Sequence, residues 1–206
     1  MDNGGKGPPD VRDDDAGFVA RCQGGEMNAF EVLVERHQKR MLNTAYRMLG
    51  DYQEACDVVQ EAFISAYKAI GGFRQESKFS TWMTTIVLNH SRNRLSQRSA
   101  RDCRECRSLD ESMEKREGRM VREPQSDAES GIDMLERKHR EARVQECIGA
   151  LDGEQKEVLV LREMQGLSYE EIGGMLKVPD GTVKSRLFRA RIAMKDCLSD
   201  LLREMR

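Results

Sequence analysis

Apolar residues recur at helical spacing along most of the 206-residue chain, which predicts an all-α fold. A first long helix is predicted over about 27–49, with Gly50 as its stop. Its apolar face consists of Phe30, Leu33, Val34, Met41, Ala45 and Met48. His37 lies on the same face, so we expect a histidine packed in the core rather than a ligand.

A second helix is predicted from Asp51, which can cap it together with Glu54, as far as Ile70. Its apolar positions are Val58, Val59, Ala62, Phe63, Ala66 and Tyr67. After the loop 73–78, a third helix places an apolar stripe inward, made of Phe79, Trp82, Met83, Ile86 and Val87. Because Trp82 belongs to that stripe, we expect it to serve the core rather than to stack on a nucleic-acid base.

The helical pattern dissolves over 102–134, where charges of both signs alternate and no apolar period is sustained. This composition predicts a flexible linker. Residues 1–15 have no apolar core behind a basic start, so we expect a disordered acidic tail and no secretory signal. The chain is therefore predicted to form two small helical domains, 16–101 and 135–206.

Helical periodicity resumes at Leu135 and continues through Ile148. Asp152 with Gln155 predicts the capped start of another helix, which Gly166 closes. The second domain thus begins with two helices in series.

The stretch 167–195 has the pattern of a helix-turn-helix. Ser168 and Glu171 have the spacing of a capping box, in which each side chain satisfies a backbone N–H at a helix start. Pro179 interrupts this helix, and a second apolar series then follows at Val183, Leu187, Ala190 and Met194. Gly173 and Gly174 each cost about 1 kcal/mol relative to alanine inside a helix. We expect their small size to let the second helix cross closely.

The polar face of the second helix of this motif has one sign of charge. Over 181–195 it carries no carboxylate and five cations, namely Lys184, Arg186, Arg189, Arg191 and Lys195. A helix that lies against phosphates and base edges needs such a face. A hairpin with a solvated basic face would explain the charges alone, but the features together and in this order favour a DNA-binding helix-turn-helix.

The net charge of −2 and the sequence pI of about 6.0 exclude a nonspecific polycation. The charges are nevertheless segregated along the chain. Residues 79–101 contain four arginines and no acid, whereas 51–61 contain four acids and no base. We expect patches of opposite sign and two kinds of partner. Because no run approaches about 18 apolar residues, we expect no membrane insertion and a cytoplasmic protein.

The chain has six cysteines, which we expect to stay reduced in the cytoplasm. Cys103 and Cys106 have the C-x-x-C spacing of half a zinc site or of a redox pair. A second C-x-x-C is absent from the sequence, and only His90, His139 and Cys147 remain to complete a metal site. We therefore expect an incidental pair in a linker, with no metal and no cofactor.

Three stretches in this order, 57–70, 73–95 and 167–191, resemble bacterial sigma factors of the small extracytoplasmic-function type. The resemblance covers nearly the whole chain. It implies a protein that binds core RNA polymerase, recognises the minus-10 and minus-35 promoter elements and promotes DNA melting. It also implies an anti-sigma protein as a further partner. One departure is Cys56, which stands where relatives commonly carry an acid.

The resemblance also implies roles for individual residues. Polymerase contacts are implied at Asp57, Val58, Gln60, Glu61 and Phe63. Contacts to the minus-10 element and the melting strand are implied at Arg74, Gln75, Glu76, Ser77, Lys78, Asn89, Arg92 and Asn93. Contacts to the minus-35 element are implied at Lys184, Ser185, Arg186, Phe188 and Arg189. The chemistry agrees, because the loop offers donors and acceptors to an unstacked base, and a basic helix fits the major groove.

Two hypotheses from other functional classes are alternatives to a sigma factor. A dimeric helix-turn-helix regulator that acts without polymerase would leave the acidic helix and the loop 73–78 without a role. An enzyme would need paired carboxylates, but Glu170 and Glu171 are adjacent and do not share a helix face, and Asp13–Asp15 fall in the tail. We expect no enzymatic activity.

Overall fold

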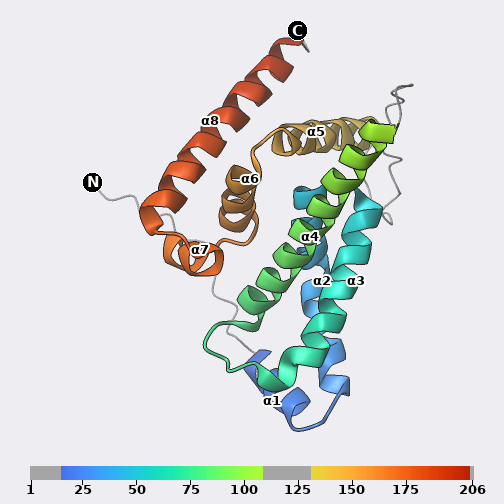
Figure 1. Ribbon diagram of the computed structural model, residues 1–206, viewed down its shortest axis with the longest axis vertical. Coiled ribbons are helices and arrows are strands. Elements are labelled where there is room, and N and C mark those ends of the chain that lie inside the picture. Colours follow the sequence, from blue (N-terminus) through green and yellow to red (C-terminus); the bar gives the residue numbers. More distant parts are fainter. Residues whose placement is uncertain (1–14, 109–130, 205–206) are drawn as a thin grey trace.

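The computed structural model describes the backbone of residues 15–108 and 131–204, and the side chains of residues 15–101 and 137–199. Within these residues the regular structure is helical throughout (Figure 1). The helices are α1 (Asp15–Gln23), α2 (Asn28–Leu49), α3 (Tyr52–Ala69), α4 (Phe79–Ser108), α5 (Gly131–Gly149), α6 (Gly153–Leu159), α7 (Tyr169–Leu176) and α8 (Asp180–Glu204). A 3-10 turn, Ile70–Gly72, follows α3, and a π-helical turn, Val160–Met164, follows α6.

The helices form two lobes, as Figure 1 shows. The N-terminal lobe consists of α1 to α4, in which α2, α3 and α4 pack against one another and α1 covers α2. The C-terminal lobe consists of α5 to α8, in which α8 contacts each of the other three helices. The lobes touch, because α5 and the π-helical turn both contact α2. The predicted all-α fold with two small helical domains is confirmed.

The ends of α4 and α5 lie inside the stretch expected as a linker. Helix α4 passes the expected domain end at residue 101 and reaches Ser108, and α5 begins at Gly131. Most of the predicted linker and tail, residues 109–130 and 1–14, lies outside the described residues.

Helix α1 was not predicted, although Val19 and Cys22 have helical spacing and are buried. Its first residue, Asp15, accepts hydrogen bonds from His37 at 2.7 Å and from Arg36 at 3.2 Å. A short helix with few apolar residues is stabilised by such tertiary contacts more than by its own propensity. The carboxylate at the expected end of the tail therefore fixes α1 on α2.

The core of the N-terminal lobe follows the predicted apolar stripes. Leu33 and Met41 of α2, Val58 of α3 and Met83 of α4 are fully buried. His37 is confirmed as a packed histidine, with its ring 5.3 Å from that of Phe79. Helix ends also follow the sequence, since Gly50 adopts the left-handed conformation after α2 and Asp51 accepts a hydrogen bond from the Glu54 N–H at 2.7 Å.

The start of α6 differs from the prediction. The Asp152 side chain makes no capping hydrogen bond to the backbone; instead, Gln155 donates to its carboxylate at 3.1 Å. The predicted cap is wrong because the two side chains bond each other. Gly166 closes the following turn in the left-handed conformation, as the sequence indicated.

The helix-turn-helix forms as predicted, from α7 and α8. Ser168 accepts from the Glu171 N–H at 3.1 Å, and Glu171 accepts from the Ser168 N–H at 2.7 Å, so the capping box is confirmed. A Cβ at Gly173 would lie 2.8 Å from the Val178 carbonyl oxygen, whereas one at Gly174 would meet nothing within 4 Å. The expectation of a close crossing is therefore confirmed for Gly173 and wrong for Gly174.

Two cysteines are paired, contrary to the expectation of reduced thiols. Cys147 of α5 and Cys197 of α8 form a disulfide with an S–S distance of 2.06 Å across 50 residues of sequence. The sequence alone could not show this pair, because it forms only when α5 and α8 pack side by side. Cys22 and Cys56 are free thiols.

Candidate nucleic-acid and protein interfaces

Helix α3 presents a polar face to solvent on the side where protein contacts were predicted. Gln60 and Glu61 are exposed, and Asp57 is half-buried. Val58 and Phe63 point into the core instead and are at most 7% exposed. These two residues are corrected from surface contacts to core residues that hold the helix, because the apolar stripe of α3 faces α2 and α4.

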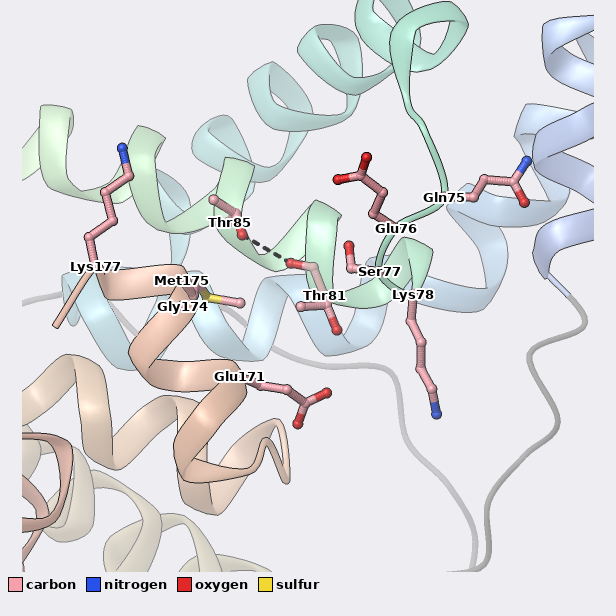
Figure 2. A pocket seen from close by; sticks show the side chains of 10 residues that line it. All are labelled: Gln75, Glu76, Ser77, Lys78, Thr81, Thr85, Glu171, Gly174, Met175 and Lys177. Carbon is pink, nitrogen blue, oxygen red and sulfur yellow. Dashed lines mark hydrogen bonds between the residues drawn. The ribbon is translucent and has the colours of Figure 1, made fainter. Parts of the chain in front are cut away.

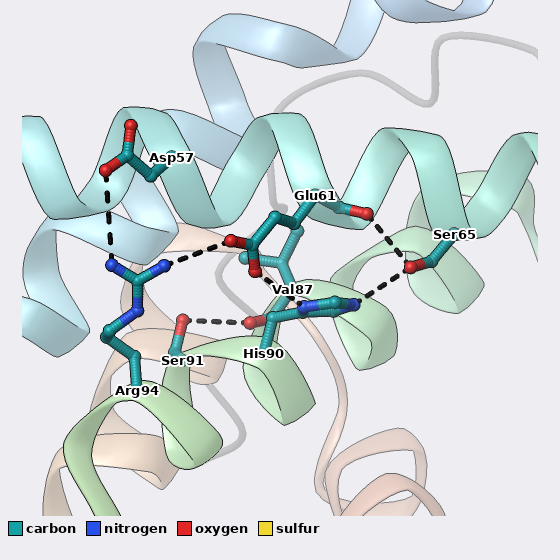
Figure 3. Close-up of polar contacts among 7 residues, drawn as sticks. All are labelled: Asp57, Glu61, Ser65, Val87, His90, Ser91 and Arg94. Carbon is teal, nitrogen blue, oxygen red and sulfur yellow. Dashed lines mark hydrogen bonds and ion pairs between the residues drawn. The ribbon is translucent and has the colours of Figure 1, made fainter. Parts of the chain in front are cut away.

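The acidic and basic stretches of the N-terminal lobe face each other rather than forming separate patches. Arg94 of α4 binds Glu61 at 3.1 Å and lies 4.0 Å from Asp57, as Figure 3 shows. Arg98 likewise lies 3.4 Å from Glu54. The prediction of two separate charged surfaces is wrong here, because α3 and α4 are antiparallel neighbours whose opposite charges pair, although the Glu61 side chain stays 52% exposed.

His90 joins the same polar cluster between α3 and α4 (Figure 3). Its Nδ1 lies 3.5 Å from Glu61, and its Nε2 lies 3.1 Å from the Ser65 hydroxyl. Ser65 donates to the Glu61 carbonyl oxygen at 2.9 Å, so its hydroxyl proton is already engaged in the helix. We therefore interpret the contacts of Ser65, His90 and Glu61 as a structural link between α3 and α4.

The loop between the 3-10 turn and α4 exposes every side chain for which a minus-10 contact was predicted, from residue 74 to residue 78. Gln75 has a φ of 56°, a left-handed conformation that is uncommon for a residue with a side chain. Strained backbone of this kind persists where the surrounding structure imposes it, and it is concentrated at binding sites. The loop is therefore shaped by its supports rather than by its own preference.

The supports of the loop come from α1 and from an aromatic stack. Gln23 donates to the carbonyl oxygens of Ile70 and Phe73, at 2.9 and 2.8 Å. Phe73 stacks on Trp82 with ring centroids 4.5 Å apart. Trp82 thus packs against the core, as predicted. The role of Gln23 was missed, because a polar residue ahead of two glycines gives no sign of its partners 47 and 50 residues away.

The remaining residues for which contact with the melting DNA strand was predicted lie on α4. Asn89 and Asn93 are exposed, while Arg92 is half-buried between the lobes. Both Arg92 Nε and Arg92 Nη2 donate to the Glu157 carboxylate of α6, at 2.5 and 2.7 Å. This hydrogen-bonded carboxylate raises the pKa of the Arg92 guanidinium above its usual range. Arg92 is therefore engaged within the molecule.

The predicted duplex-reading residues lie near the start of α8. Lys184, Ser185, Phe188 and Arg189 are exposed. Arg186 differs, because its side chain is only 19% exposed and binds Glu154 of α6 at 2.7 Å. The basic face is thus partly neutralised from inside the lobe, and Arg191 is likewise paired with Glu163 at 2.7 Å.

An open cleft of about 720 Å³ separates the loop from α7 (Figure 2). One wall consists of Gln75 to Lys78 with Thr81 and Thr85 of α4, and the other contains Glu171, Gly174, Met175 and Lys177. The predicted minus-10 contacts and the first helix of the helix-turn-helix therefore face the same space, which no sequence pattern indicated.

Among the residues whose side chains are described, no group of three or more His, Cys, Asp or Glu residues is placed to hold a metal ion. The side chains of Cys103 and Cys106 lie outside that description. Of the residues considered as further ligands, Cys147 is in the disulfide. Across the described part of the chain, no helix has the length and apolarity to span a bilayer.

Comparisons with known proteins agree with this division of the chain. The family profile described as Sigma-70 region 2 matches residues 33–101, and that described as Sigma-70, region 4 matches residues 141–194. The RNA polymerase sigma-H factor of Pseudomonas aeruginosa is 40% identical over 94% of this chain and 98% of its own length. The ECF RNA polymerase sigma-E factor of Escherichia coli K12 is 36% identical over 90% of this chain and 95% of its own length.

Solved structures share the fold. CnrH, in complex with the cytosolic domain of CnrY, superposes with a TM-score of 0.64 and 25% identity over 92% of this chain and 99% of that one. The sigma factor RpoE of Bartonella quintana, in complex with the anti-sigma factor NepR, gives a TM-score of 0.61 over 82% of this chain and 96% of that one. At 20% identity, the second likeness concerns the fold alone.

Proposed function

Because the chain belongs to the sigma-70 family, as a factor of the extracytoplasmic-function type, we propose that its two lobes divide the work of transcription initiation. The chain binds core RNA polymerase and recognises promoter DNA. The observation that carries this conclusion is that both family regions match in order, region 2 in the N-terminal lobe and region 4 in the C-terminal lobe. We assign the chain no reaction of its own.

The polymerase contact is proposed on the exposed side of α3. Gln60 and Glu61 reach solvent there, with Asp57 beside them, while Val58 and Phe63 fix the helix from below. Arg94 already restricts the conformations of the Glu61 side chain, so less side-chain entropy is lost when Glu61 binds a partner. A preorganised polar face of this kind favours a charged partner surface.

The minus-10 contacts are proposed at the loop and at α4. The loop contributes Arg74, Gln75, Glu76, Ser77 and Lys78, and α4 contributes Asn89, Arg92 and Asn93. Holding a base outside the duplex requires a rigid receptor with donors and acceptors. The anchored loop with its left-handed Gln75 supports this role.

The minus-35 contacts are proposed at the start of α8. Lys184, Ser185, Phe188 and Arg189 are exposed and ready to enter a major groove. Arg186 contributes after its carboxylate partner, Glu154, has been displaced by DNA. An anti-sigma protein is proposed as a regulator, by analogy with the complex of RpoE with the anti-sigma factor NepR, and the cytoplasm as the place of action.

Capture of core polymerase tests the assignment of α3. Changing Gln60→Ala together with Glu61→Lys should weaken binding of immobilised core enzyme at least about tenfold, because complementary charge is reversed. Glu54→Lys is the matched control, since it reverses a charge on the same helix and also frees an arginine of α4. Equal capture by the wild type and the double variant would remove α3 from the polymerase interface.

A further inference from the structure

Several side-chain hydrogen bonds join the two lobes, and the ion pair between Arg92 and Glu157 is bidentate. Both carboxylate oxygens of Glu157 are used, one by Arg92 Nε and the other by Arg92 Nη2. The Glu157 side chain is only 12% exposed, whereas that of Arg92 is 40% exposed. A bidentate pair shielded on one side is stronger than an ordinary surface ion pair.

The geometry of this pair is also that of arginine on a phosphate group. A guanidinium donates two parallel N–H groups to a phosphate as it does to a carboxylate. Arg92 lies on the face of α4 for which contact with the melting strand is proposed. Glu157 therefore occupies the position that a DNA phosphate would take on this arginine.

Further hydrogen bonds join the lobes on the side of α2. Arg40 donates to the Gln165 carbonyl oxygen at 2.5 Å, and the Gln165 side chain donates to the Thr44 hydroxyl. Arg47 donates to Gln145 at 3.0 Å. These contacts lie beside apolar packing, because one hydrophobic cluster continues through both lobes. Opening therefore requires a binding partner that offsets the lost apolar contacts and the buried hydrogen bonds.

Promoter geometry requires such an opening. Elements centred near positions −10 and −35 are about 25 base pairs apart, or about 85 Å at 3.4 Å per base pair. A lobe of about 80 residues has a radius of gyration of only about 12 Å. Two lobes in contact cannot reach both elements on straight DNA.

We propose that Glu157 competes with a phosphate of single-stranded DNA for Arg92. The pair of Glu157 with Arg92 latches the free chain in a closed state. While the latch is closed, Arg92 is unavailable to a phosphate, and α7 lies across the cleft from the loop. Binding that separates the lobes releases Arg92 and at the same time moves α7 away from the loop, whose side chains are already exposed. This inference rests on the proposed function, because it uses the assignment of α4 to the melting strand.

The test measures binding of the free, full-length chain to single-stranded DNA. The probe is a fluorescein-labelled pool of random oligonucleotides of about twelve nucleotides at low salt, because a phosphate contact needs no particular sequence. Glu157→Gln should bind about five- to tenfold more tightly than the wild type, since the charged competitor is gone. Small-angle scattering should show a larger radius of gyration for the same variant.

Glu146→Gln is the matched control, because it removes the same charge from the C-terminal lobe, where the exposed carboxylate binds Arg143 of its own helix at 3.0 Å and Arg143 has no proposed DNA contact. It should change binding less than about twofold. Thr44→Val keeps the charge and loosens the interface away from α4, so it should also tighten binding. In the background of Arg92→Ala, the gain from Glu157→Gln should vanish, as a double-mutant cycle would show.

The latch is refuted when Glu157→Gln binds no more tightly than Glu146→Gln, or when its gain persists without Arg92. Circular dichroism of each variant checks that the fold is retained. Transcription by wild-type holoenzyme is scored separately. A chain that fails to direct transcription contradicts the proposed function, whereas a chain that transcribes normally but shows no gain in the variant contradicts the latch alone.

Discussion

Arg186 and Arg189 lie three residues apart on α8, yet their surroundings differ. Arg189 is exposed, while Arg186 is largely covered and bound to Glu154. Cys22 and Cys56 show the same contrast, because Cys22 is only 4% exposed and Cys56 is half-buried. At the scale of a residue, chemical reactivity follows from what covers the side chain.

Thiol alkylation tests this contrast. Burial raises the pKa of the Cys22 thiol, and the neighbouring Arg21 offsets this only in part. A raised pKa leaves less thiolate at any given pH, so Cys22 should react with iodoacetamide at least about tenfold more slowly than Cys56 at mildly alkaline pH. Peptide mass spectrometry over time gives both rates in one sample. In denaturant the two rates should converge, and similar rates in the folded chain would contradict the burial of Cys22.

Helix α7 shows how a single element depends on its crossing partner. Its two glycines have the same propensity, but Gly173 lies under the turn at Val178 and Gly174 faces open space. The turn itself needs left-handed Lys177, whose N–H bonds back to Gly173. The helix-turn-helix is thus built around one glycine rather than two.

Alanine substitutions at this pair should have opposite effects. Gly173→Ala should lower the free energy of unfolding by about 1–3 kcal/mol, because the added methyl group meets backbone at 2.8 Å. Gly174→Ala should raise it by about 0.5–1 kcal/mol through helix propensity. Urea unfolding followed by circular dichroism measures both. A loss of stability in Gly174→Ala would mean that α7 is also crossed closely on its exposed side.

The link between α5 and α8 should contribute to stability through the covalent bond. Closing a loop of 50 residues is expected to stabilise the C-terminal lobe by about 4 kcal/mol. Dithiothreitol should therefore lower the melting temperature of the wild type. Cys197→Ser should melt at the lower temperature with or without reductant, which separates this disulfide from the other cysteines. Unchanged melting of the wild type after verified reduction would leave the bond without a stabilising role.

At the scale of the whole molecule, the loop 73–78 depends on α1 behind it and faces α7 across the cleft. Its position is therefore set in part by α1, which is about 50 residues away in sequence. In the closed state it opens onto the C-terminal lobe. In the proposed function it receives an unstacked base, which links the arrangement of the lobes to promoter opening.

Replacing Gln75, Glu76 and Ser77 by glycine tests the role of the loop in melting. Glycine tolerates the left-handed conformation at position 75, so the fold should be retained. Polymerase capture and closed-promoter binding should be nearly unchanged, while permanganate reactivity of promoter thymines should fall at least about tenfold.

A promoter mismatched over the bubble supplies the control for this variant. It should restore much of the transcription, because the cost of opening a few base pairs has been removed beforehand. Normal opening by the variant, or failure of holoenzyme assembly, would make the loop structural.

The sequence by itself determined the features that depend on neighbours within a turn or two of helix. The apolar stripes of α2, α3, α4 and α8, the stop at Gly50 and the capping box at Ser168 were all predicted, because helical period and capping are local. The family resemblance followed from the same local stretches.

Only the tertiary structure decided which charges are available. Arg92 and Glu157 are 65 residues apart, and Arg94 and Glu61 are 33 apart, so their pairing depends on how whole helices pack. The same holds for the disulfide, for α1 on its Asp15 anchor and for the left-handed Gln75. An ion pair is formed by proximity in space, and sequence patterns record proximity only along a single element.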